Sequence, residues 1–403
     1  MLDRKSSKNP VDHVKKHLKS TMNSQEDLRD ESYIQVLKQM QGHKSVEKTL
    51  RGWNFLAIMA SCYLPSIKLF YSILNYLLFE IKNNSDRVII DHANYVLVRM
   101  YKTFEIKRKN IPSEDEICHI EKMKAINVPI HFFQNSLVSG EVESYTTVKE
   151  LKTNVMKKLN FNSNKIPYFC LYEICNTKDK NEERYLDENE RVVDILSLWA
   201  QDIDEYYNKK EKIDFKIYIK IFLYYHYPAS DLDTLVADYS QCVYDVIGGK
   251  YFLKENDAIT LAALQLIGET GNNEDLAYLN VQKNLEKYVP VNMINLNPQL
   301  YYTEKIMEFY SQLNSTSKLE AKKIYLELLE KSPLWQSHQF LAKFSKKNLE
   351  NLENLPEDLV IGIKPTGVSL YDLERVNVYL NFRMNLCFIH LVSLLIGVYP
   401  VSY

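Results

Sequence analysis

The sequence predicts a multidomain α+β protein, and three observations support this fold class. The chain has 403 residues, which at about 100–200 residues per domain is enough for several domains. Hydrophobic residues make up 46% and charged residues 25% of the chain, the composition of an ordinary globular protein. Helical and strand-like patterns follow one another in long blocks, so we expect helical domains next to domains that contain strands.

The first block is predicted to be a helical bundle. Residues 66–81 carry apolar side chains at helical spacing, and residues 88–104 repeat the pattern. Polar residues interrupt the first run, which is shorter than the ~20 apolar residues that span a bilayer, so we expect a buried helix. The segment 1–25 is polar and basic and is expected to be frayed. The predicted inner faces comprise Phe70, Ile73, Leu74, Leu77, Leu78 and Ile81, and then Val88, Ile89, Ala93, Val96, Leu97 and Met100.

A change of pattern at residues 111–112 predicts a linker, and strands begin after it. Residues 128–134 predict a strand, Gly140 predicts a turn, and a second strand is expected beyond that turn. Thr147 and Glu150 have the spacing of a capping box, in which each residue satisfies the backbone N–H of the other. This pair therefore predicts the start of a helix.

Two further strands and a short helix complete the middle block. Residues 168–174 and 214–222 predict the strands, the second from its strict alternation of apolar and polar residues. Between them, Asp187 and Glu190 predict the cap of a short helix over residues 192–200. The order strand, strand, helix, strand, short helix, strand is that of a ubiquitin-like β-grasp module.

Helical patterns return over residues 231–332, and strand patterns follow them. A helix is expected at 257–267, stopped by Gly268 and Gly271, and another is expected at 319–331. The strands predicted after these helices cover residues 338–343, 359–363 and 368–371.

The charge of the chain is divided unevenly. The net charge is −2, yet residues 1–120 carry 19 Lys and Arg against 14 Asp and Glu, a net of +5, and the remaining residues have a net of −7. A basic first part favours an acidic filament or lipid surface as partner, and the alternative is a solvated face without a partner. No nucleic-acid recognition motif accompanies the basic residues, so no nucleic-acid partner is expected. The candidate filament-binding residues are Lys15, Lys16, Lys19, Lys107, Arg108 and Lys109.

The sequence contains no pattern that predicts catalysis. Only 10 of the 403 residues are glycine, and no phosphate-binding loop, metalloprotease, hydrolase or kinase motif is present. Ser315 and Lys318 have the SxxK spacing, which we interpret as a chance match. His13 and His17 are interpreted as a solvated pair and not as metal ligands. We therefore expect no enzyme activity, no catalytic residue, no metal and no cofactor.

The N-terminus and the cysteines predict a cytoplasmic protein. The first residues lack the apolar run of a signal peptide. The six cysteines are scattered and include no CxxC pair, which is typical of a chain that keeps its thiols reduced.

The helical block resembles a known domain of motor-protein tails. Residues 50–82 read LRGWNFLAIMASCYLPSIKLFYSILNYLLFEIK, which is similar to the centre of the myosin-tail-homology domain, MyTH4. That family has an Arg-Gly-Trp that opens one helix and a Pro-Ser pair before the next. Residues 28–43, 91–104 and 111–117 resemble the helices around this centre. The structural motif residues that the resemblance implies are Arg51, Gly52, Trp53, Pro65 and Ser66.

The rest of the chain resembles the FERM domain that follows MyTH4 in such tails. Residues 186–199 are similar to the end of the ubiquitin-like first lobe, and residues 239–275 to the helical second lobe. Residues 285–290 and 322–344 resemble the end of the second lobe and the first strand of the PH-like third lobe. The chain thus resembles the MyTH4–FERM tandem of unconventional myosin and plant-type kinesin tails, over roughly residues 26–375.

Two departures from the family pattern are expected. The first helices of the MyTH4 domain are missing, and the third FERM lobe is incomplete. After Val376 the sequence no longer fits, for which a truncated or wrongly spliced end is the preferred explanation, with a membrane anchor at 386–401 as the alternative. The predicted parts are an N-terminal segment (1–25), a MyTH4-like domain (26–120), a ubiquitin-like lobe (123–226), a helical lobe (227–333) and a partial PH-like lobe with an atypical C-terminus (334–403).

The resemblance implies a non-enzymatic cytoskeletal adaptor or motor-tail module in the cytoplasm, associated with the cytoskeleton. Its implied partners are cargo or adaptor protein tails and microtubules, and no motor domain is expected in this chain. The alternative is a membrane–cytoskeleton linker whose FERM lobes bind anionic lipid or receptor tails. Trp53, Trp199 and Trp335 are expected in cores. Arg51 is expected to bond a carbonyl or carboxylate, and Gly52 to permit a close helix contact.

Overall fold

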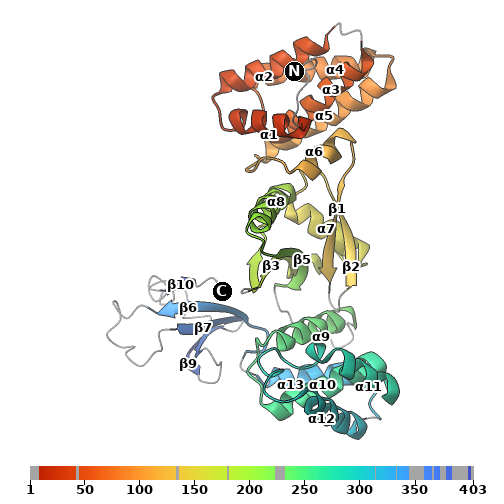
Figure 1. Cartoon of the computed structure of the whole chain (residues 1–403), viewed down its shortest axis with the longest axis vertical. Helices are drawn as coiled ribbons and strands as arrows, with labels where there is room; N and C mark the ends of the chain where they lie inside the picture. The colour runs from red at the N-terminus through yellow and green to blue at the C-terminus, as the bar shows by residue number, and fades with distance from the viewer. Residues whose placement is uncertain are drawn as a thin grey trace. The chain divides into compact units, whose positions relative to one another are not determined.

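The computed structural model of the chain divides into two compact units (Figure 1). The first unit runs to Ile219 apart from two short segments, and the second holds those segments and the chain from Lys220 onward. The described residues are 9–41, 45–132, 136–178, 181–222, 232–313, 315–332, 334–344, 358–364, 367–372, 378–383 and 398–400.

The first unit opens with a bundle of helices around α3. Helix α3 contacts α1, α2, α5 and α6, and its residues from Leu56 to Cys62 are all buried. Since a helix that is buried on every side cannot be amphipathic, this apolar run is the core of the bundle. The helices are α1 (Pro10–Thr21), α2 (Glu26–Met40), α3 (Val46–Cys62), α4 (Ile67–Asn83), α5 (Arg87–Glu105) and α6 (Glu114–Glu121).

Helix α1 corrects the prediction that residues 1–25 are frayed. Asn9 caps the helix by accepting a hydrogen bond from the backbone N–H of Val11, and Pro10 lies in its first turn. Leu18 is fully buried against the bundle. This helix was not predicted because its sequence is mostly polar. Its contact with the bundle needs only a narrow apolar stripe.

The inner faces predicted for α4 and α5 are confirmed at most positions. Phe70, Ile73 and Leu77 of α4 are buried. Ala93 and Val96 of α5 are buried as well. Leu78 and Val88 are the exceptions, because each is close to half exposed. Leu78 belongs to a second apolar stripe, on the outer side of α4.

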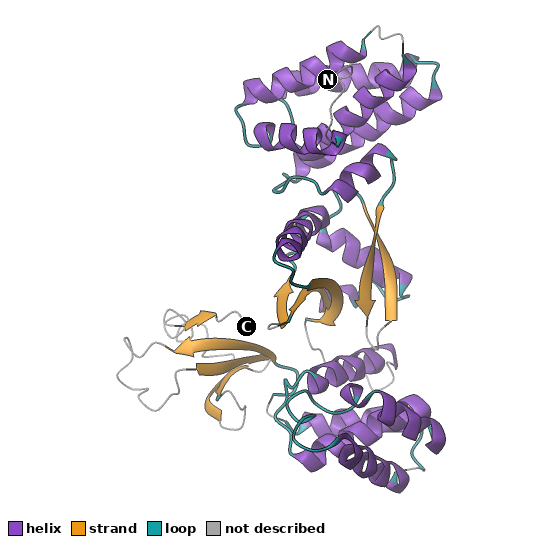
Figure 2. Cartoon of the chain, in the orientation of Figure 1, coloured by secondary structure: helices purple, strands orange, loops and turns teal. Residues whose placement is uncertain are grey.

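The middle of the chain forms a five-stranded mixed sheet of the β-grasp type. Its strands are orange in the middle of Figure 2, and their order is β2-β1-β5-β3-β4. The parallel strands β1 and β5 place Ile130 opposite Ile217 at the centre of the sheet. The ubiquitin-like module is therefore confirmed, with a polar edge strand, β4, that was not predicted because it has no apolar alternation. The elements are β1 (Ile126–Phe132), β2 (Ser136–Val142), α7 (Val148–Lys158), the 3₁₀-helix η1 (Ile166–Tyr168), β3 (Phe169–Thr177), β4 (Asn181–Tyr185), α8 (Val192–Asn208) and β5 (Ile213–Ile221).

The predicted capping box opens α7, whereas Gly140 is not a turn. The hydroxyl of Thr147 accepts from the backbone N–H of Glu150, and the Glu150 carboxylate accepts from the backbone N–H of Thr147. Gly140 lies inside β2, where a Cβ atom would come within 2.5 Å of Cδ1 of Leu151. Glycine is needed there because α7 packs closely on the strand.

Helix α8 is longer than predicted and begins differently. It extends from Val192 to Asn208, with Arg191 at the N-cap and no side-chain cap. Asp187, which was predicted to cap it, accepts a hydrogen bond from the backbone N–H of Asn189 in the preceding turn. The residue that marks the helix start is therefore Arg191, whose side chain is buried.

The second unit contains a helical lobe built around α10. Most residues from Ala258 to Ile267 are buried. The helix continues through Gly268, a predicted stop, and ends at Gly271, whose φ of 67° favours glycine. Tyr325 and Leu329 of α13 are buried. The elements are α9 (Leu232–Ile247), α10 (Glu255–Thr270), α11 (Glu274–Lys283), the 3₁₀-helix η2 (Leu285–Lys287), α12 (Gln299–Gln312) and α13 (Lys318–Glu330).

A five-stranded antiparallel sheet completes the described part of this unit. Its strand order is β10-β6-β7-β8-β9, which confirms the three strands predicted here. The apolar stretch 386–401 lies largely outside the described residues. Within the described ranges, no helix has both the length and the apolar character of a membrane span. The strands are β6 (His338–Phe344), β7 (Asp358–Lys364), β8 (Gly367–Tyr371), β9 (Val378–Arg383) and β10 (Val398–Pro400).

The replacement Trp53→Ala tests the core of the bundle. Trp53 is buried and stacks on Tyr76 with ring centroids 6.1 Å apart. Because the truncation leaves a cavity, we expect the free energy of unfolding to fall by about 3–5 kcal/mol. Chemical denaturation measures this change. Arg51→Ala, an exposed neighbour on the same helix, is the control and should cost about 0.5 kcal/mol or less. An unchanged midpoint for Trp53→Ala would show that the indole is not part of the core.

Candidate functional site

Arg191 joins the helical bundle to the ubiquitin-like lobe. Its guanidinium is buried and donates to the carbonyl oxygens of Ser61 at 3.0 Å and Lys102 at 3.3 Å, and also to that of Ile106. These oxygens lie at the C-terminal ends of α3 and α5, where backbone carbonyls lack a full set of helix partners. They also carry the negative end of each helix dipole, which favours a cation. One arginine of the lobe therefore caps two helices of the bundle.

The same guanidinium has two further partners. It donates to the hydroxyl of Thr103 and to the carbonyl oxygen of Ser144, each at 3.3 Å. The Ser144 hydroxyl donates in turn to the hydroxyl of Ser61 at 3.1 Å. Burial, reinforced by the nearby charge of Arg108, lowers the pKa of Arg191 to about 10. The side chain is still protonated at neutral pH, so all its donors remain available.

The linker after α5 carries a second buried arginine. Arg108 forms a bidentate pair with Glu116 of α6, at 2.5 and 2.6 Å, and neither side chain is open to solvent. Burial opposes the charged form, but the Glu116 carboxylate raises the pKa of Arg108 above its ordinary value. The guanidinium also donates to Ser197 of α8 at 3.2 Å. The linker is thereby held against the ubiquitin-like lobe.

Asp194 of α8 holds the backbone of the same linker. Its carboxylate accepts from the backbone N–H groups of Lys109 and Asn110, the latter at 2.7 Å. It also lies 3.6 Å from Nε of Arg108. Asp194 and Ser197 are one helical turn apart, so the first turns of α8 present a polar face to the linker.

A third contact joins α5 to the loop before α7. Arg99 pairs with Glu143 at 2.5 Å, and its guanidinium lies 3.2 Å from the centroid of the Tyr95 ring. Arg99 is itself almost fully buried. Together these contacts account for the single compact unit that the bundle and the ubiquitin-like lobe form.

The basic residues predicted to bind a filament are not all on the surface. Lys16, Lys19 and Lys107 are exposed, and Lys15 is half-buried. Lys109 is largely exposed and lies 3.7 Å from Glu190. The prediction for Arg108 is corrected, because a guanidinium paired inside the unit cannot meet a filament. The residues that remain candidates are Lys15, Lys16, Lys19, Lys107 and Lys109.

Gly52 and Arg51 have the structural roles that were predicted. A Cβ atom at Gly52 would lie 2.4 Å from Cγ of Met40, so glycine permits the close approach of α2 and α3. Arg51 pairs with the carboxylate of Glu47 at 2.6 Å on the exposed side of α3.

The Pro-Ser pair sets the start of α4. Ser66 caps this helix by accepting a hydrogen bond from the backbone N–H of Leu69. Its own backbone N–H and hydroxyl both donate to the carboxylate of Asp30 at 2.6 Å. The buried Pro65 precedes it. The pair therefore ties α4 to α2.

Two tryptophans predicted in cores are only partly buried. Trp199 stacks on Phe215 with centroids 5.0 Å apart and donates its indole N–H to Glu173. Trp335 is packed at the edge of the helical-lobe core. Both side chains are partly exposed, which apolar patterning alone does not reveal.

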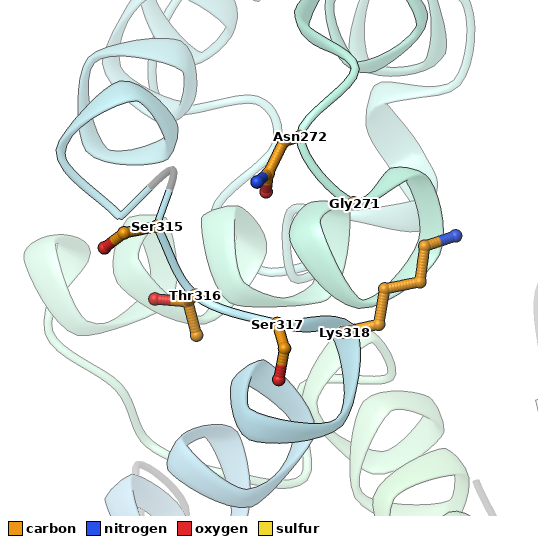
Figure 3. Close-up of a pocket in the computed structure, with 6 residues that line it drawn as sticks. All are labelled: Gly271, Asn272, Ser315, Thr316, Ser317 and Lys318. Atoms are coloured by element: carbon orange, nitrogen blue, oxygen red, sulfur yellow. The ribbon is translucent and has the colours of Figure 1, made fainter.

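The SxxK residues line an open pocket of about 350 Å³ in the helical lobe (Figure 3). Ser315 and Lys318 point in opposite directions there. The Lys318 ammonium donates to the carbonyl oxygen of Glu269, and Ser317 caps α13 through the backbone N–H of Glu320. No nucleophile–base pair is formed by these residues. In the part of the chain that the structure describes, no group of three metal-ligating side chains gathers.

Three family models match successive parts of the chain. The MyTH4 domain model covers residues 14–119, the RA like domain model 124–223 and the FERM central domain model 232–340. In this order the matches resemble a MyTH4–FERM tandem. The MyTH4 match begins within α1, earlier than the predicted start at residue 26, so this helix belongs to the MyTH4 domain.

Two of the curated relatives are a myosin and a kinesin-like protein. Unconventional myosin heavy chain 6 of Caenorhabditis elegans is 25% identical over 384 residues, 93% of this chain and 17% of that protein. Kinesin-like protein KIN-14I of Oryza sativa subsp. japonica is 25% identical over 378 residues, 90% of this chain and 29% of that protein. The chain thus spans less than a third of the length of either relative.

Solved structures of myosin tails share the fold. The MyTH4-FERM MF1 domain of Dictyostelium discoideum myosin VII, mutant 2, has a TM-score of 0.80 at 21% identity, covering 94% of this chain and 76% of that one. The human myosin 7b C-terminal MyTH4-FERM domain, in complex with the harmonin-a PDZ3 domain, has a TM-score of 0.70 at 20% identity with the same coverage.

The residues of the junction were not predicted from the sequence. Arg191, Asp194 and Ser197 follow one another at three-residue spacing across the start of α8. Polar residues on the inner stripe of an amphipathic helix are a signal, because they need partners when buried. Sequence spacing alone does not identify those partners, since they lie in α3, α5 and the linker.

The replacement Arg191→Met tests the junction. The change removes the donors of buried carbonyl oxygens, so we expect the free energy of unfolding to fall by about 2–4 kcal/mol. Urea unfolding of the full chain measures it. Arg184→Met is the matched control, because this half-exposed arginine of the same lobe should contribute about 0–1 kcal/mol. Equal losses of stability in the two variants would mean that the hydrogen bonds from Arg191 to the carbonyl oxygens of α3 and α5 do not stabilise the fold.

His17 provides a test by pH. It is half-buried with its ring 5.3 Å from Phe55, which corrects its interpretation as solvated, and burial lowers its pKa below 6.5. The unfolded chain therefore takes up this proton first as the pH falls, and stability present above about pH 6.5 is lost below it. We expect His17→Gln to lose less stability between about pH 7.5 and 5.5 than the wild type. His13→Gln, an exposed position on the same helix, should behave as the wild type. If His17→Gln lost as much stability as the wild type over this pH range, His17 would not be the group responsible for the loss.

Proposed function

We propose that this chain is a partner-binding module of a cytoskeletal motor tail or of a related adaptor, and that it acts by binding and not by catalysis. The observation that carries the proposal is the Arg191 junction, because it fixes the MyTH4 domain to the first FERM lobe. Two domains held in this way present one composite surface. The related myosin 7b tail in complex with a PDZ domain supports another protein as the class of partner.

The finer part of the proposal is weak binding of the MyTH4 domain to microtubules. The kinesin relative and the net charge of +5 over residues 1–120 support it, because a microtubule is strongly acidic. Lys16, Lys19 and Lys107 are exposed and are the best candidates. Each exposed charge contributes about 0–1 kcal/mol, so several must act together. We propose a cytoplasmic, cytoskeleton-associated location on the same grounds.

Co-sedimentation of the full chain with microtubules tests this proposal. We expect pelleting at about 50 mM salt and its loss at about 300 mM, because the Debye length falls to a few Å. Reversing Lys16, Lys19 and Lys107 to Glu should abolish the low-salt pelleting while the thermal melt stays unchanged.

The control is charge reversal at a separate group of exposed lysines. Lys209, Lys210 and Lys212 follow α8, and their reversal to Glu gives the same change in net charge. This variant should pellet as the wild type does. No pelleting by the wild type at low salt, or equal loss in both variants, would refute a filament site on the MyTH4 domain. Binding to anionic vesicles instead would support a membrane linker.

A further inference from the structure

An apolar stripe runs along the outer surface of α4 and α5. Ile67, Tyr71 and Leu78 of α4 and Tyr101 and Phe104 of α5 are each 47–61% exposed. The α4 residues are four and seven positions apart, so they lie on one side of the helix over about 17 Å. Large side chains of this kind are normally covered, and a contiguous exposed group marks an interaction surface.

The two helices form one continuous face. They pack against each other (Figure 1), and Phe70 lies beneath the seam between them. The centroid of its ring is 5.6 Å from that of Tyr71, 6.4 Å from that of Tyr101 and 5.8 Å from that of Phe104. The exposed rings are therefore supported by a buried ring, which limits the side-chain entropy that binding would cost.

The charges beside the stripe differ between the two helices. On α5, Arg87 pairs with Asp91 at 3.1 Å and Lys102 pairs with Glu105 at 3.0 Å. On α4, the exposed Lys68 and Lys82 form no ion pair within the described ranges. These two lysines give the edge of the stripe an uncompensated positive charge.

We propose that the α4–α5 face docks an acidic amphipathic helix of a partner protein. Apolar side chains of that helix would cover Tyr71, Tyr101 and Phe104, the type of aromatic group that dominates interface energies. Its carboxylates would meet Lys68 and Lys82, as in helix-in-groove recognition. The stripe matches about three turns of a helix in length.

The charges beside the stripe disfavour a second copy of this face as the occupant. A second copy of the face would bring Lys68 and Lys82 of both chains to one interface, while its carboxylates are already paired. This surface uses none of the lysines proposed for microtubules, so the inference does not depend on that proposal.

Fluorescence anisotropy with designed peptides tests the inference on the full chain. The probe is a fluorescein-labelled helical peptide of 18 residues, with Leu at every third or fourth position and Glu elsewhere. We expect saturable binding, at least about ten-fold weaker after Tyr71→Glu or Phe104→Glu. Phe79→Glu is the control, since this exposed residue of α4 lies about 100° around the helix from Leu78 and should leave binding unchanged. Circular dichroism melts verify that each variant is folded.

The second arm of the experiment separates the occupants. A peptide with Lys in place of Glu should bind at least about ten-fold more weakly, and Lys68→Glu with Lys82→Glu should reverse this preference. The inference is overturned if the acidic peptide does not bind, or if Phe79→Glu weakens it as much as Tyr71→Glu does. Phosphatidylserine vesicles that bind the wild type but not Tyr71→Glu would assign the face to membranes. A dimer by analytical ultracentrifugation that Tyr71→Glu dissociates would assign it to self-association.

Discussion

The backbone oxygens at the ends of α3 and α5 need donors, and the MyTH4 domain obtains them from the lobe next to it. Arg191 supplies these donors from the interior of the unit. A buried charge is tolerated only where its geometry and hydrogen bonds offset the loss of water. Undocking the lobe would expose the guanidinium to solvent and remove the side-chain donor of the carbonyl oxygens of Ser61 and Ile106. The bundle and the first FERM lobe are therefore stabilised by each other.

This dependence explains how a helical bundle of modest size can present fixed surfaces. The buried pair of Arg108 and Glu116 and the carboxylate of Asp194 hold the linker, so the chain between the domains is part of the interface. The lysines of α1 and the aromatic stripe of α4 and α5 then have constant positions relative to the lobe. Fixed positions lower the entropy that either proposed binding event would cost, because the two domains are already ordered relative to each other.

Local signals in the sequence predicted the elements well. The capping box at Thr147, the alternation in β5 and the helix predicted at 319–331 depend mainly on near neighbours, and the structure confirms each of them. The tandem was predicted from several segments, among them residues 50–82 and 239–275, that resemble the two domains in the order of the family. Gly140 and Gly268 were predicted as breaks, but each provides room for a packed neighbour that is distant in sequence. Arg108 was predicted to lie on the surface because it belongs to a run of basic residues. Its acidic partners, Glu116 and Asp194, lie on other helices, so the local sequence does not show that it is buried.

The central claim is that the two domains behave as one cooperative unit because of Arg191. Native-state hydrogen exchange on the full chain tests it most directly, by comparing backbone amides of α3 and α5 with those of β1 and β5. In the wild type we expect the slowest amides of both domains to exchange with a common free energy of opening. In Arg191→Met the amides of α3 and α5 should exchange at a lower free energy than those of the sheet. Separate opening of the two domains already in the wild type, or common opening retained in Arg191→Met, would contradict the account.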